Sequence, residues 1–516
     1  MVSGMGYKKP VSLSCILLSL WTAACLAAPA KKTLFNDVVN KARALAEEPF
    51  ENTGEAFPEE LRTIGYDEWR SLRFKPAKSL WPNEPFSIQF FHPGFIYHNP
   101  VNINYVEKNT AVRIPFSPDL FDYSQSGRSD LAPGDIGFAG FRVHYPLNTP
   151  TYADEIIAFL GASYFRALGK NMAYGMSARG LAVNTAEPSG EEFPYFREFW
   201  VVHPALKAQE ITVYALLDSR SLTGAYTFLI RPGEETTVDI KAVLFFRERV
   251  HKLGLAPLTS MFFHGENTTS KIEHDFRPEV HDSDGLLIQE SSGEWTWHPL
   301  VNPETLLING FGGGQPLGFG LLQRDTDFDH YQDLEARYDN RPSVWVIPGN
   351  DWNPGRLELL QIPTANEYND NIGAYWVVER PFEAGESFEF NYTLLWHTGN
   401  QKRSGLASVD STRLAKKTDD ITFVIDFLPG LSQEMIPADD ISADIQVLND
   451  YTVSFSQIIK NDITGGWRLV IHVNLEQQQW LLDKVIPNRK PVVELRAFLK
   501  NGNTRISETW SYSYLP

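Results

Sequence analysis

Carboxylates and aromatic side chains gather in the stretch from Pro363 to Trp376, which reads Pro-Thr-Ala-Asn-Glu-Tyr-Asn-Asp-Asn-Ile-Gly-Ala-Tyr-Trp. Asn and Asp favour turns, and the apolar residues that follow favour a strand, so Glu367 and Asp370 are expected on a loop at the mouth of a strand. Carboxyl groups can move protons at a glycosidic oxygen, and aromatic rings stack on the apolar faces of sugars. The stretch therefore suits a carbohydrate site, with a polar loop that caps a hydrophobic strand as the alternative.

Two further polar segments lie in the same half of the chain. The turn Phe276–Leu286 contains three acids, including Asp282, and the segment Tyr331–Ser343 contains Tyr338 and Arg341. Acids beside aromatic residues in several segments are expected where a groove binds and cleaves a polysaccharide. A structural role for Arg341, tying down its own loop, is an equal alternative.

Three tryptophans in this region are candidate platforms for sugar rings: Trp345, Trp352 and Trp376. Their flat rings could stack on glucosyl units. Tryptophan is also highly buried on average, so a place in the core is an equally good interpretation.

The sequence predicts neither a metal nor a cofactor. Asp325, Asp327 and Asp329 alternate as in a calcium loop, but His330 replaces the loop glycine and Ala336 the terminal glutamate, so a solvated acidic turn is expected. There is no His-Glu-x-x-His and no Gly-x-Ser-x-Gly. The glycine-rich run at 312–318 lacks the Gly-Lys-Ser/Thr ending of a phosphate loop.

The elements that would position these residues are mostly strands. Residues 31–75 show helical spacing, broken near Pro49, with a second short helix expected over Glu59–Arg73. From Phe86 to about residue 396 short segments of alternating polarity recur between turn residues, which predicts a large antiparallel sandwich. Helices are expected to interrupt it at Tyr152–Leu160 and Asp333–Tyr338.

A second domain is expected at the C-terminal end. Residues 397–418 are polar and basic and are predicted to form a linker. Residues 419–516 contain several short strands, which suit an immunoglobulin-like sandwich without its disulfide. The predicted fold class is therefore all-β, with a large sandwich over 31–396 followed by a small one.

The N-terminus has the pattern of a secretory signal peptide over residues 1–30. A basic Lys8-Lys9 pair precedes an apolar segment and a run of small residues, with cleavage expected after Ala27 or Ala30. Both cysteines of the chain lie within this segment, so the mature chain has no thiol for a disulfide or a metal. No later run is apolar enough to span a membrane, and a net charge of −18 disfavours nucleic acid as a partner.

Seven blocks of the chain resemble a known family: Leu131–Arg142, Phe159–Ala167, Tyr174–Ala182, Leu255–Phe262, Gly318–Arg324, Gly466–Leu469 and Ser507–Tyr512. They resemble the periplasmic glucan biosynthesis proteins G and D of Gram-negative bacteria, over nearly the whole mature chain. The Lys8-Lys9 pair favours the G member, because the D member usually carries a twin-arginine signal. The resemblance implies a mutarotase-like sandwich with a deep cleft, an immunoglobulin-like domain and residence in the periplasm.

The resemblance also implies a substrate and a pair of catalytic acids. The substrate would be glucan with a β-1,2-linked backbone, and relatives are similar to inverting endo-β-1,2-glucanases. The family's general acid falls on Asp370 and its base on Asp282, while Asp284 occupies a variable position. Tyr338 and Arg341 would position a proton relay, and nearby Glu367 would help to raise the pKa of Asp370.

The same resemblance allows a protein that does not catalyse. Such a protein would receive nascent glucan from a membrane glucan synthase and hold it for other enzymes, with the acids binding sugar hydroxyl groups. A mutarotase acting on free sugar is a third hypothesis, supported by fold analogy alone.

Overall fold

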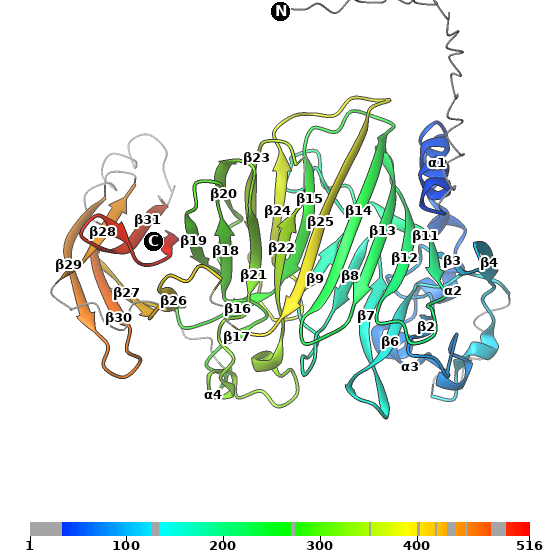
Figure 1. Cartoon of the computed structure of the whole chain (residues 1–516), viewed down its shortest axis with the longest axis horizontal. Helices are drawn as coiled ribbons and strands as arrows, with labels where there is room; N and C mark the ends of the chain where they lie inside the picture. The colour runs from blue at the N-terminus through cyan, green and yellow to red at the C-terminus, as the bar shows by residue number, and fades with distance from the viewer. Residues whose placement is uncertain are drawn as a thin grey trace, which may run out of the picture.

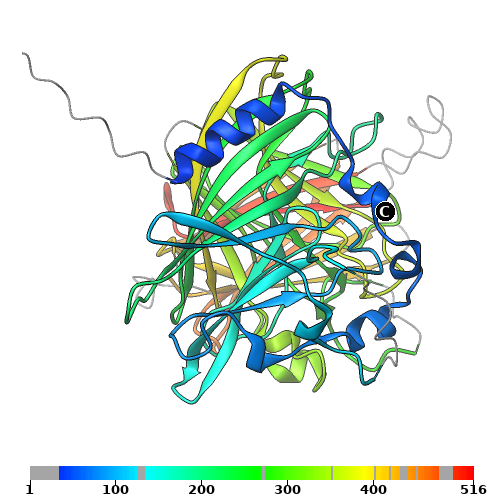
Figure 2. The same ribbon diagram turned by 90° about the vertical axis from the view of Figure 1, so that its right-hand side faces the viewer.

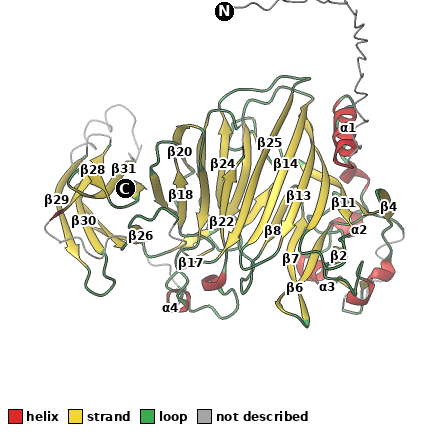
Figure 3. Cartoon of the chain, in the orientation of Figure 1, coloured by secondary structure: helices red, strands yellow, loops and turns green. Residues whose placement is uncertain are grey.

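Two long β-sheets face each other across a hydrophobic core in the computed structural model (Figure 1). The structure describes residues 34–125, 134–269, 274–349, 352–399, 403–417, 420–430, 440–448, 451–475 and 492–515. The expected signal peptide and both cysteines lie outside these residues. The regular structure of the described part is mostly strand, as predicted, and strands far outnumber helices in Figure 3.

The first sheet has ten strands within the described residues. In spatial order they are β2 (Ser87–Phe91), β6 (Gly140–Thr149), β7 (Tyr152–Leu160), β8 (Tyr164–Ala167), β9 (Ser177–Arg179), β15 (Leu253–Ser260), β24 (Ile372–Val378), β23 (Gly355–Gln361) and β20 (Leu307–Gly314), with β10 (Ala182–Val183) also paired to β15. The neighbours along this sheet run antiparallel.

The second sheet has fifteen strands and continues into the C-terminal part of the chain. In order they are β28 (Ile441–Val447), β31 (Val493–Asn501), β33 (Thr509–Tyr514), β19 (Trp295–Pro299), β18 (Gly285–Gln289), β21 (Gly318–Leu322), β22 (Ser343–Pro348), β25 (Ser387–His397), β14 (Thr236–Phe246), β13 (Leu222–Arg231), β12 (Ile211–Asp218), β11 (Tyr195–Val202), β3 (Asn102–Glu107) and β4 (Thr110–Ile114), with β32 (Thr504–Arg505) on β31. Alternate residues of both sheets fill the space between them with aliphatic and aromatic side chains.

The remaining elements lie around this sandwich. The strands are β1 (Arg73–Phe74) with β5 (Phe121–Asp122), β16 (Phe262–His264) with β17 (Val280–His281), and a four-stranded sheet of β26 (Ser408–Lys416), β27 (Asp420–Leu428), β30 (Trp467–Asn474) and β29 (Thr452–Lys460). The helices are α1 (Leu34–Ala46), α2 (Glu59–Arg62), α3 (Tyr66–Ser71) and α4 (Phe328–Tyr331), and the 3₁₀ turns are η1 (Thr53–Ala56), η2 (Pro76–Lys78), η3 (Pro118–Leu120) and η4 (Tyr338–Asn340).

Helix α1 lies across the outer face of the second sheet, as Figure 2 shows. Its buried residues Val38 and Ala42 pack in one cluster with Trp200, Leu216 and Phe245. The helical interpretation of the N-terminal segment is thus confirmed for α1. No helix of the described residues is long and apolar enough to cross a membrane.

The predictions of two helices are wrong. Tyr152–Leu160 forms strand β7, because it pairs with β6 and β8 on its two sides and this tertiary pairing overrides the helical propensity of its residues. In the other segment α4 ends at Tyr331 and η4 begins at Tyr338. Between them the Asp333 carboxylate accepts the N–H groups of Glu335 and Ala336, which closes a turn instead of a helix.

The C-terminal strands form a second, smaller two-sheet unit. The sheet β26-β27-β30-β29 packs against β31 and β33 through a core that also contains Trp295, Trp297 and Trp345 of the large sandwich. The two units therefore share a hydrophobic core. Residues 397–418 were expected to be a linker. Within them, Ser408–Lys416 pairs along β27 and forms strand β26.

Candidate active site

Asp282 directly follows strand β17 and is held at two points. Its backbone N–H donates to the carbonyl oxygen of Met261 at 2.8 Å, and its carboxylate accepts a hydrogen bond from the guanidinium of Arg341. Asp282 is 4% exposed. Burial raises the pKa of this carboxyl, and the positive charge of Arg341 opposes the rise.

Arg341 stands where η4 leads into β22. Its guanidinium lies over the ring of Tyr338, 4.2 Å from the ring centroid, and also donates to the carbonyl oxygen of Ala336 at 3.2 Å. Tyr338 is buried, and burial raises the pKa of its hydroxyl. Arg341 thus ties down its own loop, as the structural alternative expected, and it also binds Asp282; its role in a proton relay stays a prediction.

Asp370 lies at the end of the loop that leads into β24. The next residue, Asn371, is buried and uses its side-chain amide to bind the backbone of β16. The amide oxygen accepts the N–H of Phe262 at 2.9 Å, and the amide nitrogen donates to the carbonyl oxygens of Phe262 and Ile362 at 3.0 Å each. Asp282 and the residue after Asp370 are therefore anchored to adjacent residues, Met261 and Phe262.

The carboxyls of Asp282 and Asp370 are close enough for their charges to interact. The side chain of Asp370 is exposed, yet its pKa is raised, first by loss of solvent to the surrounding protein and second by the charge of Asp282. A carboxyl that contacts solvent on one side and protein on the other is expected to show both exposure and a raised pKa. Arg166 on β8 and Arg341 act in the opposite sense on both acids.

Glu367 takes part in a different network. Its carboxylate accepts from Arg277, which also binds Asp275 at 2.8 Å and Asp333 at 2.9 Å. This arginine joins three separate segments and so fixes the loop before Asp370. The acid whose charge raises the pKa of Asp370 is Asp282, where the sequence suggested Glu367.

The tryptophans proposed as sugar platforms lie in the core. Trp345 is 3% exposed and stacks on Trp295 with 5.8 Å between ring centroids. Trp376 is also 3% exposed, and Trp352 is 1% exposed. Their rings fill the space between sheets and leave no free face for a sugar, so the core alternative describes them.

Aromatic rings of the N-terminal segment lie near Asp370 instead; Tyr97 and Trp69 are half-buried, and Tyr66 is exposed. Tyr97 packs on Trp69 of α3, with 4.7 Å between ring centroids, and Tyr66 lies next to Trp69 at 6.3 Å. The charge of Asp370 contributes to raising the pKa of Tyr97 and also of Tyr164 on β8. Sequence reasoning missed these rings because they lie more than two hundred residues from Asp370. Their one local signal was the Tyr66 and Trp69 pair in a short helix.

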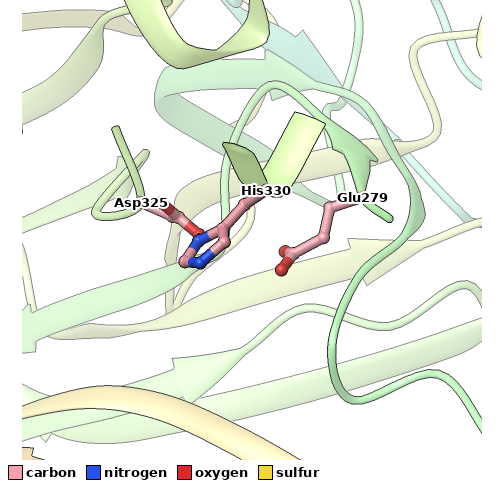
Figure 4. Close-up of side chains that lie close together, drawn as sticks. All are labelled: Glu279, Asp325 and His330. Carbon is pink, nitrogen blue, oxygen red and sulfur yellow. The ribbon is translucent and has the colours of Figure 1, made fainter. Parts of the chain in front are cut away.

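A second polar cluster lies beside α4 (Figure 4). The ligand atoms of Glu279, Asp325 and His330 lie within 4.8 Å of one another, and two carboxylates with an imidazole are a set that can bind a metal. Each group already has a partner, however. His330 is hydrogen-bonded to Asp325, and Glu279 accepts from His281 Nε2 at 2.9 Å. The cluster is thus accounted for as a network of ion pairs.

Comparison with known proteins places this chain in one family. Residues 34–514 match the family model described as periplasmic glucan biosynthesis protein, MdoG. A glucans biosynthesis protein G of Ralstonia nicotianae is 46% identical over 93% of this chain and 96% of its own length. A glucans biosynthesis protein G of Vibrio cholerae serotype O1 is 43% identical over 92% of this chain and 86% of its own. The resemblance stated from the sequence is confirmed, and the chain belongs to the MdoG family of periplasmic glucan biosynthesis proteins.

Proposed function

We propose that this protein cleaves linear β-1,2-glucan in the periplasm during glucan biosynthesis, by an inverting mechanism. The observation that carries the proposal is the anchoring of Asp282 and the Asp370 loop to the adjacent residues Met261 and Phe262. It brings two acids that are distant in sequence within range of each other's charge. Family membership supports the glucan, and the signal-peptide pattern supports the compartment.

Asp370 has the properties of a general acid. It is exposed to a substrate, and its raised pKa favours the protonated form that can donate to a leaving oxygen. Asp282 has the properties of a base that stays ionised, because Arg341 hydrogen-bonds its carboxylate. Since Asp282 is buried, it would act on the attacking water through a hydroxyl or a second water. We assign the ordering of such a relay to Tyr338, whose ring packs against Arg341.

The surroundings of Asp370 suit a chain of several sugars. Tyr97 and Trp69 supply ring faces on the side of the N-terminal segment, and Tyr164 supplies one on the side of β8. Arg179 lies between the rings of Tyr164 and Phe193, 5.2 and 5.0 Å from their centroids. Rings from two separate segments near the acid favour an internal cut in a polymer over action on a free sugar.

The test is incubation of the purified mature protein with linear β-1,2-glucan, with products separated by size and their anomeric form followed by NMR. We expect shorter glucans with inverted anomeric configuration. Asp370→Asn and Asp282→Asn should each lower the rate by about 10²–10⁴-fold, because each removes a proton-transfer group. Asp462→Asn, at an exposed turn in the C-terminal unit, is the matched control and should leave the rate unchanged. Intact polymer with the wild-type protein would refute cleavage.

The second candidate is a scaffold that takes nascent glucan from a membrane synthase and hands it on. It is favoured by the half-buried rings near Asp370, Trp69 and Tyr97, which can bind sugar without any chemistry. In cells that lack the native gene, Asp370→Asn would then restore periplasmic glucan, whereas Trp69→Ala with Tyr97→Ala would not. The enzymatic proposal predicts failure of both.

A further inference from the structure

A polar cavity opens at the end of the large sandwich, away from the two acids. Its volume is about 210 Å³, and it lies between β19 and β33 of the second sheet and the edge strand β20 of the first. The lining side chains that matter here are Thr296, His298, Asn309, Phe311, Ser511 and Ser513.

One wall of the cavity reverses the usual polarity of a sandwich interior. In β19 the rings of Trp295 and Trp297 point into the core shared with the C-terminal unit, so Thr296 and His298 face the other sheet. In β33 Trp510 and Tyr512 alternate in the same way with the serines. The parallel pairing of Thr296 with Thr509 sets the two polar rows side by side. A sandwich interior is normally filled by apolar side chains at such positions.

The opposite wall combines an amide with an aromatic ring. The side-chain nitrogen of Asn309 donates to the Ser513 hydroxyl at 2.7 Å, and its oxygen accepts from Gln361 at 3.2 Å. The ring of Phe311 stands edge-on to His298, 5.1 Å away. A flat apolar surface and fixed hydrogen-bonding groups thus face the same space.

One lining group is left without a partner. Thr296 is 2% exposed, and its hydroxyl makes no hydrogen bond within the described residues. A buried hydroxyl is costly unless something binds it. His298 is also buried, and burial lowers its pKa to about 3, so the ring is neutral; its Nδ1 is hydrogen-bonded to the Ser511 hydroxyl at 3.4 Å.

We propose that this cavity is a second, non-catalytic binding site for one neutral sugar unit, such as glucose or the end of a glucan chain. Sugar hydroxyls both donate and accept, as do the serines, Thr296 and the neutral imidazole, and Phe311 offers a surface for the carbon face of the ring. The carboxylates of Glu290 and Glu494 and the guanidinium of Arg496 also line the space, so it lacks the uniformly positive lining that an anionic ligand would need. At about 210 Å³ the cavity is smaller than the roughly 300–1,000 Å³ of drug-sized sites, so it suits a single unit and not a passing polymer.

Ordered water is the competing occupant, since the cavity has room for about seven molecules at roughly 30 Å³ each. The sugar proposal therefore needs a test that separates the two. It does not depend on cleavage at Asp282 and Asp370, because none of the lining residues belongs to that site.

The experiment is calorimetric titration of the full mature protein with D-glucose, together with crystals soaked in glucose. Thr296→Val keeps the shape of the side chain and removes the hydroxyl, so we expect binding to weaken about tenfold while the melting temperature stays level or rises. Ser511→Ala should weaken binding as well. Thr452→Val, the same change at an exposed position of β29, should have no effect.

Three results would overturn the proposal. They are no glucose binding to the wild-type protein, equal affinity in Thr296→Val and Ser511→Ala, and soaked crystals that show only water in the cavity. Each of them leaves the assay of β-1,2-glucan cleavage, and its Asp370→Asn variant, unaffected, so failure of this site is distinct from failure of the catalytic proposal.

Discussion

Arg341 and Arg166 supply the positive charge around the two acids, in different ways. Arg341 donates directly to Asp282, whereas Arg166 is an exposed residue of β8 whose charge acts on both carboxyls. Inverting hydrolysis needs one acid protonated and the other ionised at the same pH. The direct contact at Asp282 favours ionisation there, and the loss of solvent at Asp370 favours its proton.

Arg341→Gln should move the acid limb of the pH profile of kcat/KM. That limb reports ionisation of the base, and loss of the guanidinium leaves the pKa of Asp282 raised by burial without its main opposing charge. The limb should therefore shift to higher pH, by roughly 1–2 units. Arg341→Lys keeps the charge and should shift the limb less. An unmoved limb in Arg341→Gln would mean that Asp282 is not the base.

The residues of this site differ in how well the sequence alone could identify them. Asp282 and Asp370 were identified through the family resemblance, and their catalytic roles stay predictions. Trp345 and Trp376 were ambiguous, since the same residue type serves cores and sugar platforms, and only burial separates the two. Tyr97 and Trp69 were not identified, because the Tyr66 and Trp69 pair in a short helix does not by itself indicate that the fold brings these rings near Asp370.

The segment β16–β17 is the element that places the acids. Its two strands pair with each other. Met261, directly before β16, accepts the backbone N–H of Asp282, and the N–H of Phe262 in β16 donates to the side chain of Asn371. Alternation of apolar and polar residues predicted that the chain from Phe86 to about residue 396 forms a large antiparallel sandwich. It could not reveal this short pair, since two- or three-residue strands carry no periodic signal.

Asn371→Ala tests whether β16 holds the Asp370 loop. The variant leaves three backbone groups of Phe262 and Ile362 without their amide partner, at about 1–3 kcal/mol for each group that stays buried. We expect a lower melting temperature and a large fall in kcat, since the loop would no longer hold the acid in place. Glucan cleavage and thermal unfolding should be measured on the same preparation. Wild-type kcat in a folded variant would show that the loop needs no such anchor.

The two units of the molecule are joined by a buried ion pair as well as by the shared core. Arg324, after β21, donates two hydrogen bonds of 3.0 Å to Glu508, and the guanidinium lies 3.7 Å from the ring centroid of Trp297. Both side chains of the pair are 3% exposed. Glu508 also accepts the N–H of Val409 on β26, so one carboxylate connects both units.

Glu508→Gln should destabilise the protein by about 3–5 kcal/mol, because it leaves the Arg324 charge buried without its counterion. The measurement is urea unfolding at neutral pH. Replacing both partners, as in Arg324→Leu with Glu508→Leu, should recover much of the loss, since no charge then remains buried. A double variant as unstable as the single one would assign the effect to packing and not to charge.

Two groups near Arg324, namely Asp284 and His281, make the stability of the protein depend on pH. Burial opposes the charge on His281, but its hydrogen bond with Glu279 and the nearby acids raise its pKa to about 9, while burial raises the pKa of Asp284 to about 7. Between its unfolded pKa and its folded pKa, each group holds a proton in the folded state that it has released in the unfolded chain. For Asp284 stability therefore falls as pH rises from about 4 to 7, and for His281 as pH rises from about 6.5 to 9.

The His281 contribution can be isolated in the upper window, where Asp284 has largely ionised in both states. Its folded pKa of about 9 against 6.5 corresponds to on the order of 3 kcal/mol lost between pH 6.5 and 9. The wild-type melting temperature should fall over this range. His281→Gln keeps a donor toward Glu279 but cannot titrate, so its melting temperature, lower at pH 6.5, should fall much less as pH rises. Parallel curves for the two proteins would show that the proton on His281 does not stabilise the fold, and that the pH dependence comes from groups elsewhere in the chain.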